Sequence, residues 1–484
     1  MFLYGFSRHW MVGVHLEEKN EDIDDWTSYS SAQYGTGVNA WDAQESEHEA
    51  LDYEDLDYIE DNYEISPAPS HSGQSYLVKL GCCDFCLGRI GGVSLVNKTL
   101  KDAGSQIRKE ISKSDETLKE IKVEYCPLCE DLFSEIELIT SRLISALSEY
   151  EFSRLQLGFQ LPNDLIESEE QIRNSYGARK SYNLKQSLSS EISMRLRMLI
   201  DGVEIVNEHP EILVLVDCLT LSFKIECRSL YLYTRYCKFE RGLPQTHWNC
   251  RTCKGRGCEK CDHTGLQYLE SVQSLIADPL LDIFSADSHS THSMGREDID
   301  VRCLGNGRPT VIELKNPRKR NADLESLTKL INKHASGKVE IKPLRVSNKS
   351  EVVRVKDAAA DKSYHICFKL IKKLDEDDNE IDFLLTDDEI ISKISQLNGV
   401  ELNQRTPKRV SHRRADKIRK RRIIELSDVI VNGEFVEFKL KAQSGTYIKE
   451  MVTSDHGRTI PSVAELLDLD CQVEWLDVLD IHSD

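Results

Sequence analysis

Eight of the 15 cysteines fall into four C-x-x-C pairs, and this pattern constrains the fold more than any other feature of the sequence. A tight turn lets each pair offer two thiolates to one metal ion, and two pairs complete a tetrahedral site. Disulfide frameworks, the alternative, belong to secreted chains. The first 16 residues are a poor signal peptide, because their apolar stretch is broken at Ser7, Arg8 and His9. We therefore expect an intracellular protein that binds zinc.

The spacing groups the pairs into two predicted zinc sites. The predicted ligands are Cys83, Cys86, Cys126 and Cys129 in the first site, and Cys250, Cys253, Cys258 and Cys261 in the second. Cys82 competes with Cys83 for the first site, and the x-x spacing favours Cys83. Four thiolates leave no open coordination position, so both zinc ions are expected to be structural, with free or redox-active thiols as the alternative.

The net charge of −20 is concentrated at one end of the chain. Residues 1–75 contain 17 acidic and two basic residues, whereas the rest contains 65 acidic and 60 basic residues. This segment has no stable hydrophobic period, so we predict a disordered acidic tail over 1–75, with folding on a partner as the alternative. No apolar run approaches the ~18 residues that a membrane span needs, so no membrane contact is expected.

Hydrophobic patterns predict two folded parts after the tail. An accessory domain over 76–270 is expected to begin with a strand at 76–80 and to contain a helix at 131–150 and three strands within 211–239. A second domain over 271–484 is expected to begin with a helix at 271–284. A β-hairpin at 299–314 should follow, because Asn306-Gly307 suits a type I′ turn.

Two basic segments suggest contact with a phosphate backbone. Residues 404–422 carry ten Arg or Lys and a single acid, Asp416, and residues 315–320 form a second cluster. A charge run is often only a solvated face, but two runs in an acidic protein favour nucleic acid. The aromatic residues Tyr364 and Tyr447 could stack on an extruded base, although packed strand aromatics are the simpler interpretation.

An acidic cluster precedes both basic segments in the sequence. The sequence GREDIDVR places Glu297, Asp298 and Asp300 between Arg296 and Arg302. A carboxylate with cations nearby stays ionised, which suits a nucleophile or an electrostatic stabiliser. A salt-bridged turn explains the same residues, and the pattern alone leaves both interpretations open.

Several long motifs resemble one enzyme family. GREDIDVRCLGNGRP with VIELKNPRKR resembles the catalytic motif of the archaeal and eukaryotic pseudouridine synthases of the Pus ten family, which modify the T-arm of tRNA. LYTRYCKFERGLPQTHW, QRTPKRVSHRRADKIRKRR and QSGTYIKEMVTSDHGRTIPSVAELL resemble the family in the same order. The resemblance covers residues 76–484. The chain departs from the family pattern at Thr234 and in the loop 454–459.

The resemblance implies an α+β protein. A mixed-sheet pseudouridine synthase domain would follow an α/β accessory domain with a THUMP-like region and four-cysteine zinc sites. It implies isomerisation of uridine at position 54, position 55 or both in the T-arm of tRNA, without an organic cofactor. The implied partner is tRNA, with other structured RNA as an extension. The nucleus, the cytoplasm and the mitochondrion all remain open, and the oligomeric state is not indicated.

The resemblance also assigns roles to individual residues. Asp298 takes the position of the nucleophile, whereas Asp300 does not match it. Substrate-binding positions fall on Arg296, Tyr364, Tyr447 and Lys449. Among these, Tyr364 would stack on the uracil and Lys449 would pair with the nucleophile. Val463 would form an aliphatic wall under the base.

The sequence leaves two other functions open. A non-catalytic RNA-binding adaptor, for instance in small-RNA processing, would use the same zinc and basic surfaces. The joint presence of Asp298, Tyr364 and Lys449 argues against such a loss of catalysis. A different THUMP-bearing tRNA enzyme, such as a thiolase or a methylase, is disfavoured because the sequence has no P-loop or glycine-rich nucleotide motif.

Overall fold

The computed structural model describes residues 70–92, 99–121, 123–178, 181–372 and 385–483. The predicted acidic tail therefore lies outside the described residues up to residue 69. The strand predicted at 76–80 is wrong, because helix α3 occupies Ser70–Lys79. Tyr76 stacks on Tyr176 of helix α7 with ring centroids 3.7 Å apart. A short apolar run does not distinguish a strand from a buried helix, and this packing decides for the helix.

Helices form most of the part that contains the first cysteine pairs. They are α4 (Asp84–Ile90), α5 (Leu100–Ser114), the 3-10 helix η1 (Glu116–Glu120), α6 (Ile136–Leu147), α7 (Asn163–Tyr176) and α8 (Leu184–Leu199). The helix predicted at 131–150 is confirmed as the shorter α6, whose buried positions include Ile136, Ile139, Leu143 and Leu147. These helices share one hydrophobic core with the first cysteines and with the small sheet.

The small sheet has the strand order β2-β1-β3-β4. Its strands are β1 (Arg154–Gln160), β2 (Glu204–Ile205), β3 (Ile212–Asp217) and β4 (Ser222–Cys227). β1 pairs in parallel with β2 and β3, whereas β3 and β4 are antiparallel. The three strands predicted within 211–239 are confirmed, but the third one, β5 (Leu230–Lys238), belongs to a different sheet.

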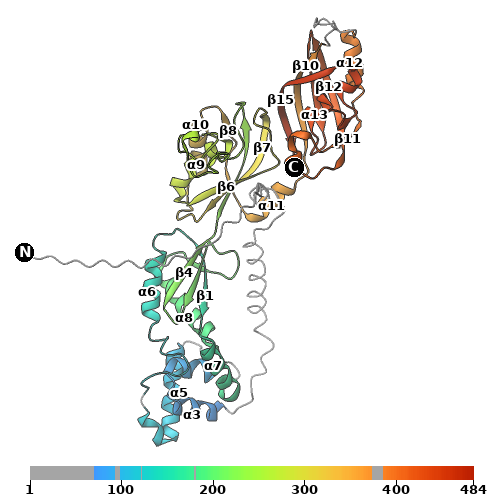
Figure 1. Cartoon of the computed structure of the whole chain (residues 1–484). Helices are drawn as coiled ribbons and strands as arrows, with labels where there is room; N and C mark the ends of the chain where they lie inside the picture. Colours follow the sequence, from blue (N-terminus) through green and yellow to red (C-terminus); the bar gives the residue numbers. More distant parts are fainter. Residues whose placement is uncertain (1–69, 93–98, 122, 179–180, 373–384, 484) are drawn as a thin grey trace, which may run out of the picture. The chain divides into compact units, whose positions relative to one another are not determined.

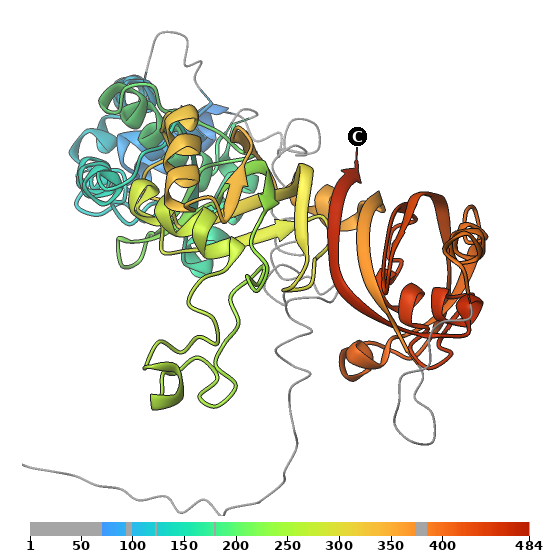
Figure 2. The ribbon, with the colours of Figure 1, turned by 90° about the horizontal axis from the view of Figure 1, so that it is seen from above.

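That second sheet has eleven strands in the order β14-β11-β12-β13-β10-β15-β7-β5-β8, with β6 on β7 and β9 on β5. The remaining strands are β6 (Ser288–Ser293), β7 (Arg302–Lys315), β8 (Val339–Ile341), β9 (Arg345–Ser347), β10 (Asp361–Ile371), β11 (Glu401–Arg405), β12 (Ile418–Asn432), β13 (Phe435–Ala442), β14 (Thr459–Ile460) and β15 (Asp470–His482). β10 runs beside β15 in both views (Figures 1 and 2). Because β5 joins it, this sheet extends across the predicted domain boundary at 270/271.

The hairpin predicted at 299–314 is wrong. Residues 302–315 form the single strand β7, and both of its halves pair with β5 rather than with each other. Lys238 is opposite Cys303 and Tyr236 is opposite Arg308, so residues 304–307 bulge out of the ladder. Gly307 has the positive φ that the turn motif requires, but a neighbouring strand decides the pairing.

Helices cover the large sheet in two places. α9 (Val272–Phe284), which confirms the helix predicted at 271–284, and α10 (Leu324–His334) share a core with β5 and β7. The others are α11 (Lys349–Asp357), α12 (Asp387–Ser395), α13 (Ile448–Thr453) and α14 (Val463–Leu467), and a 3-10 helix, η3, spans Lys408–Arg413. α13 and α14 pack against β15, and α12 packs against β12. No helix in the described ranges is long and apolar enough to cross a membrane. The α+β fold class and the mixed sheets are as predicted.

Candidate active site and metal centres

The GREDIDVR segment connects β6 to β7 and carries the predicted nucleophile on a tight turn. Gly295 opens the segment with φ +76°, a backbone conformation that glycine adopts without strain. The carbonyl of Asp298 accepts a hydrogen bond from the Val301 N–H at 3.1 Å, which closes a β-turn. The Asp298 side chain is about one-third exposed, so its carboxylate is accessible from solvent.

Lys449 reaches this turn from the first part of α13. Its Nζ lies 3.4 Å from Asp298 Oδ2, and 2.7 Å and 2.8 Å from the two carboxylate oxygens of Asp300. The structure thus brings Asp298 and Lys449 together, as the resemblance implied, and adds Asp300. Burial opposes ionisation of Asp300, but the hydrogen bonds and charge of Lys449 prevail and lower its pKa.

A buried glutamine holds the start of α13, where Tyr447 and Lys449 lie. Gln404 on β11 is 1% exposed. Its Oε1 accepts from the Tyr447 N–H at 2.9 Å, and its Nε2 donates to the Tyr447 carbonyl at 3.0 Å. The half-buried Tyr447 thereby has a fixed backbone two residues before the Lys449 ammonium.

Tyr364 lies on β10 and is buried. Burial raises the pKa of its phenol to about 12, against the opposing charge of Arg308. Arg308 in turn lies 2.8 Å from the carboxylate of Glu297, the residue before Asp298. The phenol of Tyr364 is therefore neutral at physiological pH, and the Arg308–Glu297 ion pair lies next to Asp298 in the chain.

The other predicted site residues have different surroundings. Arg296 lies over the Trp248 ring, with its guanidinium carbon 5.5 Å from the ring centroid. This contact ties the predicted nucleophile segment to the loop that carries the second cysteine cluster. Val463, the first residue of α14, is fully buried in the core, so its aliphatic side chain packs against protein.

A buried polar network under the turn was not predicted. The carboxylate of Glu297 accepts hydrogen bonds from the Tyr236 hydroxyl at 2.9 Å and from Gln245 Nε2 at 3.3 Å. Gln245 also donates to the Gly295 carbonyl at 3.2 Å. The available signal was the motif LYTRYCKFERGLPQTHW, which contains Tyr236 and Gln245, but the motif does not show what these two residues contact.

The basic segments have mixed roles. Lys417, Lys420 and Arg422 are exposed around the start of β12, as a phosphate-binding surface requires. By contrast, the Arg320 guanidinium of the 315–320 cluster donates to the Arg228 carbonyl and to Cys227 Sγ, so this residue supports the fold.

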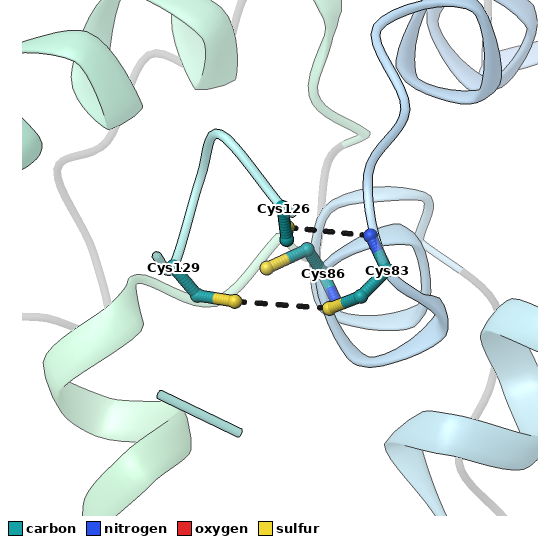
Figure 3. A group of neighbouring side chains, drawn as sticks. All are labelled: Cys83, Cys86, Cys126 and Cys129. Atoms are coloured by element: carbon teal, nitrogen blue, oxygen red, sulfur yellow. Dashed lines mark hydrogen bonds between the residues drawn. The ribbon is translucent and has the colours of Figure 1, made fainter. Parts of the chain in front are cut away.

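The first predicted cysteine site is assembled as expected (Figure 3). The sulfur atoms of Cys83, Cys86, Cys126 and Cys129 lie within 4.8 Å of one another, and Cys82 is not in the group. A zinc ion with bonds of about 2.3 Å needs S–S edges of about 3.8 Å, and the Cys83–Cys129 edge is 3.7 Å. The residues therefore fit a tetrahedral metal ion.

A buried arginine supports this cluster. Arg89 is fully buried, and its guanidinium donates to Cys86 Sγ at 3.4 Å and to the Leu128 carbonyl at 3.2 Å. It also forms an ion pair with Glu169 of α7. A cation beside four thiolates offsets their negative charge, and outer contacts of this kind orient metal ligands.

The second predicted cysteine site also fits a metal. Cys250, Cys253, Cys258 and Cys261 converge, with S–S distances of 3.7 to 3.9 Å. The N–H of Gly265 donates to Cys261 Sγ at 3.3 Å, which favours the thiolate form. None of the 15 cysteines, which all lie in the described ranges, forms a disulfide.

Comparisons with known proteins agree with the motifs. Residues 231–482 match the family described as Pus10, C-terminal, and residues 139–217 match the Pus10 THUMP domain, archaeal. The protein named tRNA pseudouridine synthase Pus10 of Methanococcus voltae is 34% identical over 392 residues, covering 81% of this chain and 74% of that relative. The proteins of the same name from Methanothrix thermoacetophila and Archaeoglobus fulgidus are also 34% identical, covering 84% and 74% of this chain and 93% and 95% of theirs.

The matched ranges include β7, β10 and α13, and hence every residue of the site around the Asp298 turn. The adaptor and the other THUMP-bearing enzymes are therefore disfavoured on sequence as well as on geometry. This chain belongs to the Pus10 family of tRNA pseudouridine synthases.

Proposed function

We propose that this protein isomerises uridine to pseudouridine in the T-arm of tRNA, at position 54, position 55 or both, with Asp298 as the nucleophile. The pairing of Asp298 with the Lys449 ammonium at 3.4 Å is the observation that supports this most strongly. A cation at that distance pairs with the carboxylate and orients it, as a nucleophile requires.

The reaction moves the uracil from a C–N to a C–C bond. The bond between C1′ and N1 breaks, the base rotates, C1′ joins C5, and the C5 proton is lost while N1 gains one. The Asp298 carboxylate either attacks C1′ or removes a sugar proton to give a glycal-type intermediate. The uridine must first leave its stack, because neither atom is reachable inside a helix.

The surrounding residues supply the pocket in this proposal. Tyr364, as a neutral phenol, stacks on the extruded uracil rather than acting as a strong base. Tyr447 lines the pocket, and Arg296 contacts the substrate next to the nucleophile. The exposed cations near the start of β12 contact the RNA backbone without reading its sequence. Other structured RNA can meet the same requirements.

We further propose zinc as the metal in both cysteine clusters, with Cys83, Cys86, Cys126 and Cys129 holding one ion and Cys250, Cys253, Cys258 and Cys261 the other. Zinc held by four thiolates stabilises local structure and supplies no open position for catalysis. The uridine chemistry is then carried out by the side chains alone, without an organic cofactor.

The test of the function is Asp298→Asn on a T-arm transcript. We expect wild type to form pseudouridine and Asp298→Asn to form none, while both bind the RNA with similar affinity, since the amide keeps the shape of the carboxylate. Carbodiimide mapping locates the product at position 54 or 55, and fluorescence anisotropy measures binding.

Asp300→Asn is the matched comparison, because it makes the same change two residues away and also beside Lys449. It should retain turnover if Asp298 is the nucleophile. An active Asp298→Asn with an inactive Asp300→Asn would reassign the nucleophile. An inactive wild type that binds the transcript would favour the adaptor function.

A further inference from the structure

One short segment of the chain holds the backbone of the Asp298 turn at three consecutive carbonyls. The contacts are Lys238 Nζ to Asp298 O (3.3 Å) and Ile299 O (3.0 Å), Gly242 N to Ile299 O (2.9 Å), and Arg241 Nη1 to Asp300 O (2.9 Å). The segment 238–242 begins where β5 ends. The turn is therefore fixed from the side of β5, independently of the contacts that Lys449 makes with the carboxylates.

Lys238 is the unusual member of this segment. Its side chain is fully buried, and its ammonium also donates to the Leu243 carbonyl at 2.8 Å. An ammonium has three N–H donors, and these three acceptors are all backbone carbonyls. Burial lowers the pKa of Lys238, which reflects the cost of placing a cation here.

A buried ammonium is costly unless it is hydrogen-bonded, and all three donors of Lys238 are used by backbone carbonyls. The ammonium supplies donors that an apolar side chain lacks, and two of its three acceptors belong to the turn that presents Asp298. Its position thus connects it to the geometry of the carboxylate.

We propose that Lys238 is a positioning residue for the isomerisation: its ammonium fixes the turn Asp298–Val301 so that the Asp298 carboxylate faces C1′ of the extruded uridine. This inference rests on the proposed function, because Lys238 acts only through Asp298. Displacement of a reacting group by about 1 Å can reduce the rate by about 10²-fold. Loss of the Lys238 hydrogen bonds to the turn should therefore lower turnover rather than RNA binding.

The experiment compares Lys238→Met with wild type in the full chain, using a T-arm transcript. Methionine keeps much of the side-chain volume and removes the charge and the donors. We expect kcat to fall by about 10²-fold with KM within about twofold of wild type. Lys238→Arg, which restores a buried cation with N–H donors, should recover part of the lost kcat.

Lys393→Met is the matched control, because Lys393 Nζ donates to the Leu466 carbonyl at 2.8 Å, a contact that joins α12 to α14. It should leave kcat unchanged. Circular dichroism and thermal unfolding establish that each variant is folded at the assay temperature. A merely structural role for Lys238 would lower the melting temperature without lowering kcat of the folded enzyme.

A folded Lys238→Met enzyme with wild-type kcat would overturn the inference while leaving the proposed function intact. An inactive wild type would instead overturn the proposed function. If Lys238→Met does not fold, Arg241→Gln replaces it, since this partly exposed side chain donates to the Asp300 carbonyl. A lowered kcat at unchanged KM then supports the inference that residues 238–242 position the Asp298 turn, and an unchanged kcat contradicts it.

Discussion

Lys449 contacts two carboxylates, and the contrast between them illustrates how single residues acquire their roles. Asp300 lies closer to the ammonium and is more than half exposed, whereas Asp298 is farther away and about one-third exposed. Proximity to a cation alone would select Asp300. The resemblance implied Asp298, and the contacts from residues 238–242 hold the backbone of the turn that carries it. Charge and backbone geometry therefore have to be considered together at this site.

Glu313 gives a residue-scale prediction about pH. It lies on β7 and pairs with His292 of β6, with Oε2 and Nε2 2.8 Å apart. Burial raises the pKa of Glu313, but the hydrogen bond and charge of His292 prevail and lower it from 4.5 to about 2. The folded state binds the proton more weakly than the unfolded chain. Ionised Glu313 therefore stabilises the fold above pH 4.5, and this contribution is lost as pH falls towards about 2.

We accordingly expect Glu313→Gln to lower the free energy of unfolding by up to ~3 kcal/mol near neutral pH, with a smaller deficit in acid. Urea unfolding of wild type and Glu313→Gln between about pH 7 and about pH 3 measures the difference in their free energies of unfolding. A difference that stays constant, or widens, as the pH falls through 4.5 would contradict the lowered pKa of Glu313.

At the scale of elements, the residues of the proposed active site come from separate pieces of the large sheet. Asp298 lies between β6 and β7, Tyr364 on β10, and Lys449 on a helix that packs against β15. Each piece has its own support: residues 238–242 for the turn, and Gln404 for the start of α13. The relative positions of these side chains therefore depend on the contacts between these elements.

Gln404→Leu tests the support of α13. Leucine has similar volume but removes the partner of the Tyr447 N–H and leaves the Tyr447 carbonyl only the Met451 N–H, which should cost about 1–3 kcal/mol of stability. The shift of Lys449 should also lower kcat. Thermal unfolding and turnover on the T-arm transcript measure the two effects.

Gln404→Glu is the informative comparison, since a carboxylate can accept from the Tyr447 N–H but cannot donate to its carbonyl when ionised. Its stability should fall below that of wild type, because an ionised carboxylate is costly at this buried position and places an acceptor against the Tyr447 carbonyl. Wild-type stability in both variants would show that the amide contacts are dispensable.

At the scale of the whole molecule, the two cysteine clusters have different environments. The first belongs to a large hydrophobic core that includes the strands of the small sheet. The second forms a core that contains no buried residues other than its own cysteines, within the described part of the chain. Metal loss should therefore unfold much of the accessory part in the first case and only a loop in the second.

Cys126→Ser and Cys253→Ser test this difference. Elemental analysis should find about two zinc ions in wild type and about one in each variant. Calorimetry should show a clear loss of stability for Cys126→Ser and a small change for Cys253→Ser. Two zinc ions in either variant, or equal destabilisation by both, would contradict this account.

The sequence by itself determined the features that depend on neighbours along the chain. The C-x-x-C pairs predicted both cysteine clusters, because the turn that joins each pair of ligands is local. The helices at 131–150 and 271–284 were predicted because their apolar residues recur with the helical period. The family resemblance supplied Asp298 and Lys449, which charge patterns alone could not separate from a salt-bridged turn.

Only the tertiary structure decided the features that depend on distant partners. Residues 76–79 belong to a helix that packs on α7 through Tyr76, and residues 302–315 form one strand because β5 pairs with both halves. The same holds for Lys238, whose buried ammonium finds two of its three acceptors about 60 residues away in the chain. Hydrogen-bond partners and burial come from chain segments far apart in sequence, so no local pattern specifies them.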